Sequence, residues 1–454
     1  MNLNAMLEDL EELVVCESFS ADHEAVARSA KVVADQGTRL LGARPETIVI
    51  DGVTHLRWTF GTPRALLVGH HDTVWPVGTL TRIPWSLVDG IARGPGVFDM
   101  KAGLVQTFHA LAALPSLDGV CVLVTGDEEV GSPSSRTLIE ETARECAAAF
   151  VLEAGGDGGA LKVARKGISI YELMVHGRAS HAGLDPEKGA NAGIELAHQI
   201  LTIAGIADQV NGDLPGRTTS ETSPVAGARE TRARETGARE AGTRETGARE
   251  TRTREAGARE TRTREAGARE TRTREAGARE TRTREAGTRE AGARETGTSS
   301  GSLGTTTVTP TALFGGTTVN TVPALARVSV DVRVPTLAAQ ERVDELMRAL
   351  APRLAGTRLE VSGGPNRPPL EEASSAALFA VAQRIAADLG LAPLTGVGVG
   401  GASDGNYTAG VGCPTLDGLG AVGGGAHADS EHVVVSEMPG RTALLTGLVQ
   451  AVLR

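Results

Sequence analysis

The 454-residue sequence contains few cysteines, few aromatic residues and no long apolar run. The four cysteines, Cys16, Cys121, Cys146 and Cys413, lie far apart, and no Cys-x-x-Cys pair occurs. This distribution argues against a disulfide framework and against a cysteine-ligated zinc site, and it fits a reducing compartment. Because only 3% of the residues are aromatic while 57 are glycine, the core must be mostly aliphatic and alanine-based.

Two further absences exclude other classes of protein. The N-terminus carries acidic residues where a signal peptide needs basic ones. No apolar run approaches the roughly 18 residues of a membrane span, so we expect a cytoplasmic protein that makes no membrane contact. The 46 lysine and arginine residues against 56 aspartate and glutamate residues give a net charge of −10, which disfavours a nucleic-acid partner. The apolar content of 40% is enough for a sizeable core, and the length allows two or three domains.

An internal repeat occupies residues 226–297. An Arg-Glu pair recurs every five residues, from Arg229-Glu230 to Arg294-Glu295, and gives the segment 19 arginines and 14 glutamates. Nothing in the segment is more apolar than alanine, so it cannot contribute to a core, and its low-complexity composition predicts disorder. Favourable Glu-to-Arg pairs four residues apart leave a fraying helix as the alternative, although glycine and threonine oppose it.

The rest of the sequence alternates between strand and helix patterns. Buried apolar strands are expected within 65–74, 119–131 and 148–156, with helices over 101–114 and 134–149 between them. This order predicts an α/β domain with a mostly parallel sheet. All three strands end in ionisable residues, and ligands bind at the carboxyl ends of the strands in such sheets.

A different pattern begins near residue 163. The expected elements are strands at 168–177, 305–314, 325–335 and 357–362 and helices at 188–205 and 336–351. This order predicts a small α+β domain with an antiparallel sheet. We therefore expect residues 1–162 and 367–454 to form one domain, and residues 163–366, which include the repeat, to be inserted into it.

Ionisable side chains gather where the expected strands end and in two loops. They are His70, Asp72, Asp99, Glu128, Glu129, Glu153 and His427. Asp127, Glu128 and Glu129 stand next to one another, and such crowded carboxylates are costly without a compensating cation. Carboxylates and imidazoles suit zinc and similar divalent ions, and two ions about 3.5–4 Å apart need a bridging carboxylate, for which Asp99 is the candidate. Glu128 and Glu129 then offer one general base and one ligand.

Each of these residues could instead be structural. A His-x-Asp triplet is weak evidence alone, and Asp99 could simply cap the helix that follows it. The three adjacent acids could form a solvated loop, and Glu153 could be a surface charge.

Seven motifs resemble, in the same order, those of the di-zinc aminoacylase and carboxypeptidase family. They are GHHDTV, GPGVFDMKAG, TGDEEVGS, GRASHAG, GGTTVNTVPA, DVRVP and GAHADSEH. This family includes acetylornithine deacetylase, succinyl-diaminopimelate desuccinylase, peptidase T and the glutamate carboxypeptidases. Within it the chain looks most like the glutamate carboxypeptidase group, because of VFDMKAG, RASHAGLDPEKGANA and Glu153.

The resemblance implies a mostly parallel-sheet di-zinc catalytic domain with an inserted α+β dimerisation, or lid, domain. Two Zn²⁺ ions, with Co²⁺ or Mn²⁺ as alternatives, would be bound by His70, Asp99, Glu129, Glu153 and His427. Asp99 would bridge the ions, Asp72 would orient His70, and Glu128 would be the general base. Two departures bear on these ligands: His71 sits beside His70, and Ala154 replaces the proline that often follows the Glu153 position.

The resemblance also assigns residues that meet the substrate. His181 matches the histidine that stabilises the oxyanion in the partner subunit's site, which implies a homodimer formed through the inserted domain. Asn320, Arg333 and Arg367 match family positions that contact polar groups or a carboxylate, for which an arginine offers bidentate geometry.

These features predict a metal-dependent hydrolase that uses a water activated by two zinc ions. It would release a C-terminal amino acid, with glutamate favoured, from a small peptide or N-acyl amino acid. An N-acyl amino acid deacylase resembling acetylornithine deacetylase is the alternative, because the motifs do not distinguish the leaving groups. A non-catalytic scaffold is a remote alternative, since every expected ligand and the base are present.

Overall fold

The computed structural model describes residues 2–213 and 303–454. The repeat at 226–297 therefore lies outside the described residues, and its conformation stays a prediction. Within the described residues, no helix combines the length and the apolar character that crossing a membrane would require.

The first sheet has six strands in the order β1-β2-β6-β3-β7-β14. Their bounds are Glu46–Ile50, Val53–Thr59, Val120–Thr125, Ala65–His70, Ala148–Val151 and Thr415–Leu416. Strand β3 is parallel to β6 and to β7, and β14 is parallel to β7, whereas β1 and β2 add an antiparallel edge. Every residue of β3, β6 and β7 is buried, as expected for strands that are covered on both faces. The parallel-rich sheet of an α/β fold is thus confirmed.

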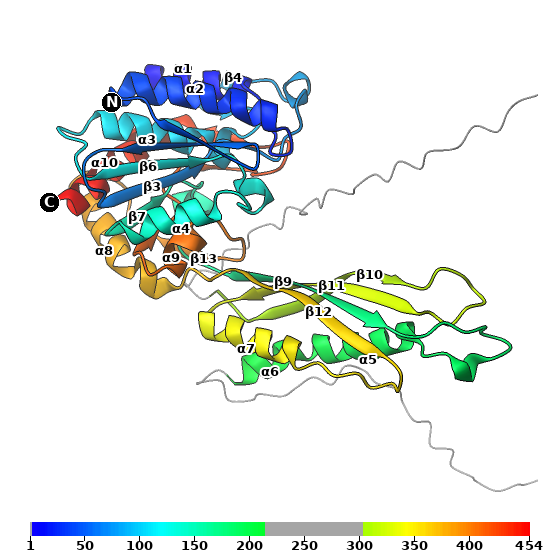
Figure 1. Ribbon diagram of the computed structural model, residues 1–454. Helices are drawn as coiled ribbons and strands as arrows, with labels where there is room; N and C mark the ends of the chain where they lie inside the picture. Colours follow the sequence, from blue (N-terminus) through cyan, green and yellow to red (C-terminus); the bar gives the residue numbers. More distant parts are fainter. Residues whose placement is uncertain (1, 214–302) are drawn as a thin grey trace, which may run out of the picture. The chain divides into compact units, whose positions relative to one another are not determined.

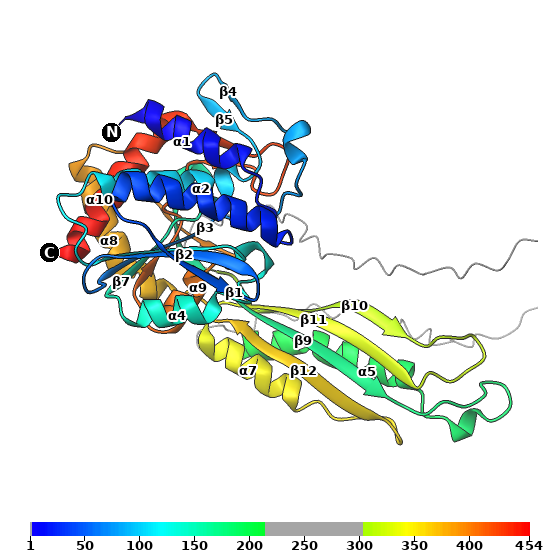
Figure 2. The ribbon, with the colours of Figure 1, turned by 45° about the horizontal axis from the view of Figure 1, so that its top comes forward.

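Helices cover both faces of this sheet (Figures 1 and 2). The helices in these layers are α1 (Leu3–Val15), α2 (His23–Leu41), α3 (Ala102–Ala112), α4 (Arg136–Arg144), α8 (Glu372–Asp388), α9 (Gly405–Gly410) and α10 (Met438–Leu453). One apolar core joins α1, α2, α3, α8 and α10 to the sheet, and a smaller core packs α4 and α9 against it. Helix α2 begins where the Asp22 side chain accepts a hydrogen bond from the Ala25 amide, and it ends at Gly42 in the left-handed conformation.

The second sheet is antiparallel and has the order β10-β11-β9-β12. Its strands are Thr307–Gly315, Leu325–Val334, Gly167–His176 and Arg358–Arg367, and helices α5 (Ala192–Ala204), α6 (Ile206–Gly212) and α7 (Leu337–Arg348) lie along one face (Figure 1). Burial alternates along β9, where Tyr171, Leu173 and Val175 point into the core beneath the helices. This is the α+β unit that the alternating pattern predicts.

Two smaller pairings complete the chain. Strand β8 (Leu161–Arg165) runs parallel to β13 (Gly396–Val399). Strand β8 therefore continues past the expected domain boundary at residue 162 and pairs with a strand of the 367–454 segment. A four-stranded sheet has the order β15-β16-β5-β4. Its strands are Gly423–Gly424, His432–Val434, Ile91–Arg93 and Ser86–Val88. It connects the C-terminal loop that carries His427 to the segment that precedes Asp99.

Candidate metal centre

The ends of three parallel strands bring the expected ligands together. His70 is the last residue of β3, Glu128 and Glu129 open a short turn after β6, and Glu153 follows β7. Because β3 is parallel to both neighbours, all three strands end at the same edge of the sheet. Asp99 joins them from the segment before α3.

The His70 imidazole makes contacts at both ring nitrogens. Its Nε2 lies 3.5 Å from Asp99 Oδ1 and 3.5 Å from Glu153 Oε1. Its Nδ1 lies 3.0 Å from the backbone oxygen of Asp72 and 3.4 Å from that residue's Oδ1. An acceptor on the Nδ1 side places the ring proton there and leaves the Nε2 lone pair facing the carboxylates.

His427 meets the other side of Asp99. Its Nε2 lies 3.2 Å from Asp99 Oδ2 and 3.2 Å from Glu129 Oε2. Asp99 therefore presents one oxygen to each histidine, which is the arrangement of a carboxylate that bridges two cations. His427 adopts a left-handed conformation, with φ of 61°.

Several of these atoms have no hydrogen-bond partner among the described residues. They are His70 Nε2, Asp99 Oδ1, Glu129 Oε1 and His427 Nε2, all of which are buried. Buried polar atoms without partners are costly, so this cluster fits a cation. Two groups of three residues each place one ligand atom per residue within 4.8 Å of the others in the group. One group is His70, Glu128 and Glu153, and the other is His70, Asp99 and Glu129.

The electrostatics of the cluster also fit bound cations. The carboxylates of Asp99 and then Glu129 raise the pKa of His427 to about 11. Burial and then the neighbouring Asp99 charge raise the pKa of Glu129 to about 7. These groups hold protons that divalent ions would displace.

Asp72 holds the acidic turn beside His70. Its carboxylate accepts hydrogen bonds from Ser20 Oγ at 2.6 Å and from the backbone amides of Glu128 and Glu129, each at 3.2 Å. The aspartate is completely buried. It thus fixes both the imidazole and the turn that carries the two glutamates.

Glu128 pairs with Arg367, at the end of β12. Arg367 Nη1 lies 2.9 Å from Glu128 Oε1, while Nη2 donates to Ser132 Oγ and Nε donates to the Tyr407 hydroxyl. Burial raises the pKa of Glu128 to about 8, although the Arg367 charge opposes the rise. The guanidinium expected to contact substrate is itself buried and engages Glu128.

The other residues expected to meet substrate lie on the insertion. The exposed His181 accepts hydrogen bonds at Nδ1 from the amides of Gly183 and Leu184, at 3.2 and 3.1 Å. Asn320 is next to it, because residues 181 and 321 form a bridge. Arg333 Nε and Nη2 each donate to the Asp331 carboxylate at 3.0 Å.

Sequence reasoning missed several buried charges around the ligands. Arg165 lies 3.7 Å from Glu153 Oε2 and pairs with Asp417 at 2.6 Å. The Asp404 carboxylate accepts from Ser132 and Thr125. The position of Asp404 in the glycine-rich GGASDGN stretch is the one local signal that could have marked it.

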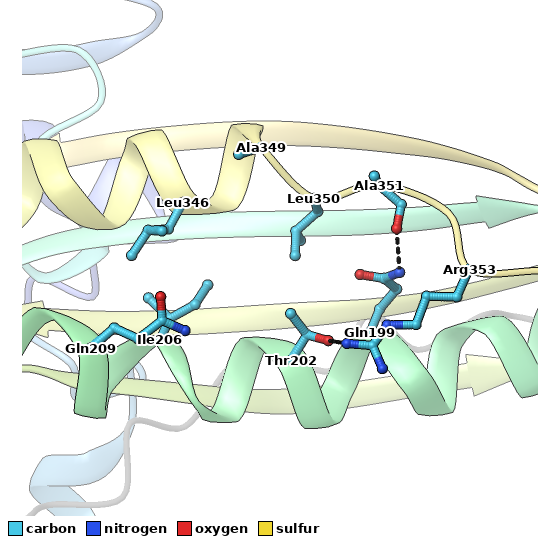
Figure 3. A pocket seen from close by; sticks show the side chains of 9 residues that line it. All are labelled: Gln199, Thr202, Ile206, Gln209, Leu346, Ala349, Leu350, Ala351 and Arg353. Atoms are coloured by element: carbon cyan, nitrogen blue, oxygen red, sulfur yellow. Dashed lines mark hydrogen bonds between the residues drawn. The ribbon is translucent and has the colours of Figure 1, made fainter.

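One hollow among the described residues lies on the insertion. It has a volume of about 260 Å³ and is lined by α5, α6, α7 and the segment after α7 (Figure 3). Within its lining, Gln199 donates to the backbone oxygen of Ala351, and Arg353 donates to the Thr202 hydroxyl. None of the candidate metal-centre residues lines it.

Comparison with known proteins gives a match to one family and relatives that align over part of their length. A model of the peptidase family M20/M25/M40 matches residues 66–451. Carboxypeptidase G2 from a Pseudomonas species is 30% identical over 217 residues, which cover 45% of this chain and 52% of that protein. Succinyl-diaminopimelate desuccinylase 2 from Shewanella loihica is 28% identical over 199 residues, which cover 39% and 52%. The chain thus spans about half the length of these curated relatives.

Solved structures share the fold. A metallo-carboxypeptidase from Sulfolobus solfataricus has a TM-score of 0.62 at 17% identity, with 98% of this chain and 99% of that chain covered. A dinuclear metal-binding peptidase from Bacillus subtilis has a TM-score of 0.57 at 12% identity, with 99% and 98% covered. At such low identity these likenesses concern the fold alone.

Proposed function

Since the chain belongs to the peptidase family M20/M25/M40, we propose that it is a metal-dependent hydrolase that cleaves an amide bond. The product is a C-terminal amino acid, with glutamate favoured, released from a small peptide or an N-acyl amino acid. The observation that supports this most strongly is the Asp99 carboxylate, whose two oxygens face His70 and His427 respectively.

Two ions fit the donor set. His70 and Glu153 would hold one ion, Glu129 and His427 would hold the other, and Asp99 would bridge them. Nitrogen and carboxylate donors favour Zn²⁺, with Co²⁺ or Mn²⁺ as alternatives. When bound, the ions would supply Lewis-acid polarisation of the substrate carbonyl and activation of a water at neutral pH.

Glu128 is the general base in this proposal. It accepts a proton from the attacking water and returns it to the leaving nitrogen as the carbon–nitrogen bond breaks, so the proton balance closes. Burial raises the pKa of Glu128, which makes its carboxylate a stronger proton acceptor. Asp72 positions the reaction centre, since it contacts His70 and the amides of Glu128 and Glu129.

His181 would donate to the developing oxyanion. Because its Nδ1 accepts from two backbone amides, the ring proton is on Nε2 and is available to a carbonyl oxygen. We place this donor in the partner's site within a homodimer formed through the insertion. Asn320, Arg333 and Arg367 would contact the substrate, with the arginines binding its carboxylate.

The substitution Glu128→Gln tests the chemical step. It keeps the shape of the side chain but removes the base, so turnover should be lost while zinc content is retained. Glu360→Gln is a matched control, because Glu360 is an exposed residue that pairs with His176 and Arg358. Unchanged turnover in the Glu128 variant would refute the assigned base.

A deacylase acting on N-acyl amino acids is the second candidate, and its support is the desuccinylase relatives. A panel of dipeptides and N-acyl amino acids ending in Glu, Leu or Arg separates the two functions by ninhydrin detection of released amino acid. Preference for Glu-terminated peptides supports the carboxypeptidase, and preference for acyl derivatives supports the deacylase. No release from any substrate by the zinc-loaded protein would refute both.

We also propose a cytoplasmic location.

A further inference from the structure

The Glu431 carboxylate lies buried between two segments that carry ligands of the proposed centre. Its Oε1 accepts hydrogen bonds from the backbone amides of Phe98 and Asp99, at 2.9 and 3.1 Å. Its Oε2 accepts from the Gly96 amide at 3.0 Å and from Trp75 Nε1 at 2.8 Å. Four donors thus converge on one carboxylate, and three of them belong to the turn that presents Asp99.

Glu431 is also tied to His427 by the loop between them. The Glu431 amide donates to the Ala428 oxygen at 2.9 Å, and the Ala428 amide donates to the Gly425 oxygen at 2.9 Å. A side chain at Gly425 would lie 2.8 Å from backbone atoms of Ser430, so the loop closes tightly on itself. After it, β16 is fixed by its pairing with β5.

Asp99 and His427 are far apart in the sequence, yet His427 Nε2 and Asp99 Oδ2 lie 3.2 Å apart. Each sits on irregular backbone, because Asp99 has φ of −115° within its turn and His427 has φ of 61°. Glu431 links the two segments, because its carboxylate accepts from the Asp99 amide and its own amide donates to the oxygen of Ala428, the residue after His427. Among the described contacts, the Glu431 side chain reaches the proposed ligands through the backbone amide of Asp99, and its charge also acts on the Asp99 carboxyl.

We propose that Glu431 is a positioning residue that holds Asp99 in register with His427 and thereby sets the metal affinity of the centre. This inference rests on the proposed metal-dependent function. Outer partners that orient ligands typically change metal affinity about 10–100-fold when they are removed. The substitution Glu431→Gln keeps the size but turns one acceptor oxygen into an amino group, which faces backbone N–H donors and cannot accept from them.

The test is a zinc titration of the metal-depleted full-length protein in competition with a chromophoric chelator. The unmodified protein should bind two ions, and Glu431→Gln should lose about 10–100-fold in affinity for at least one of them. Trp75→Phe removes one of the four donors to Glu431 and leaves its carboxylate in place, so it should weaken binding of the same ion less. It serves as the second variant if Glu431→Gln does not fold.

Glu195→Gln is the matched control. Glu195 is another fully buried carboxylate, and it accepts from the amides of Arg353 and Leu354 on the insertion. The control should lower the melting temperature but leave both zinc affinities unchanged. Unchanged affinities in both Glu431→Gln and Trp75→Phe would overturn the positioning role alone. An equal loss of zinc affinity in Glu195→Gln would also overturn the positioning role. If the unmodified protein did not bind zinc, both the positioning role and the proposed function would be overturned.

Discussion

Arg367 and Glu128 form a buried ion pair, with Nη1 and Oε1 2.9 Å apart. The pair joins the end of β12 in the second sheet to the acidic turn after β6, 239 residues away in the sequence. Tyr407 and Ser132 accept further hydrogen bonds from the same guanidinium. The residue expected to bind a substrate carboxylate therefore also sets the charge environment of the proposed base.

The first prediction concerns the charge of Arg367. In Arg367→Met the cation is lost, and the pKa of Glu128 should rise further, because an opposite charge nearby lowers a carboxyl pKa by about 1–3 units. A base with a higher pKa is protonated over more of the pH range, so the acidic limb of the kcat/KM profile should move to higher pH. Arg358→Met, which changes an exposed arginine, should leave the profile in place. If the acidic limb did not shift in the Arg367 variant, the Arg367 charge would not control the pKa of the catalytic base.

The second prediction concerns Asp99. The substitution Asp99→Asn keeps the shape of the side chain but removes the charge that would be shared between two cations. Zinc content after dialysis, measured by mass spectrometry of the metal, should fall from two ions to one or none. Asp35→Asn alters an exposed pair with Lys31 and should keep both ions. Retention of two tightly bound ions by the Asp99 variant would contradict the bridging role.

A third prediction follows from removing the metal. Burial raises the pKa of Glu128 from 4.5 to about 8 and that of Glu129 from 4.5 to about 7. Groups whose folded-state pKa is raised bind more protons in the folded than in the unfolded state, so their contribution to stability is lost as pH rises. The melting temperature of metal-free protein should therefore fall between about pH 4.5 and pH 8.

The metal-loaded protein should show the opposite dependence over this interval. Zinc requires deprotonated ligands, so its affinity, and with it the stabilisation of the folded state, increases with pH. Calorimetric melting of both forms at several pH values checks this. Parallel curves for the two forms would show that these glutamates lie outside the metal centre.

The sequence predicts the parts of this fold that local patterns determine. Strands β3 and β6 are recognisable because they are buried on both faces and therefore consist of continuous apolar runs. The grouping of the candidate ligands at their ends follows from the rule that parallel strands end together. Asp99 and His427 lie in loops, so no periodicity connects them; side-chain chemistry makes them candidates, and the resemblance to a family implies their roles.

Contacts between distant segments could not be predicted in this way. Glu431 accepts from Gly96 across 335 residues, and Arg165 pairs with Asp417 across 252. Nothing in the local spacing of these residues indicates a partner, because burial and pairing arise only once the chain has folded. The pairing of β8 with β13 across the insertion is unpredictable for the same reason.

The last prediction concerns the Arg165 and Asp417 pair. Arg165 Nε lies 2.6 Å from Asp417 Oδ2, and Ser403 Oγ also donates to this carboxylate, which is completely buried. Breaking a buried ion pair by removing one partner costs about 3–5 kcal/mol, because the remaining charge has lost its compensation. In Arg165→Met we therefore expect the free energy of unfolding, measured with urea, to fall by about that amount.

The same substitution should weaken zinc binding. Arg165 Nη2 lies 3.7 Å from Glu153 Oε2, so the arginine restrains a carboxylate that would hold one ion. Arg342→Met changes an exposed arginine paired with Glu345 and should alter the free energy of unfolding by no more than about 0.5 kcal/mol. If Arg165→Met were as stable as this control, the buried pair would contribute little to folding. If it lost stability but kept its zinc affinity, the contact with Glu153 would not matter for the ion.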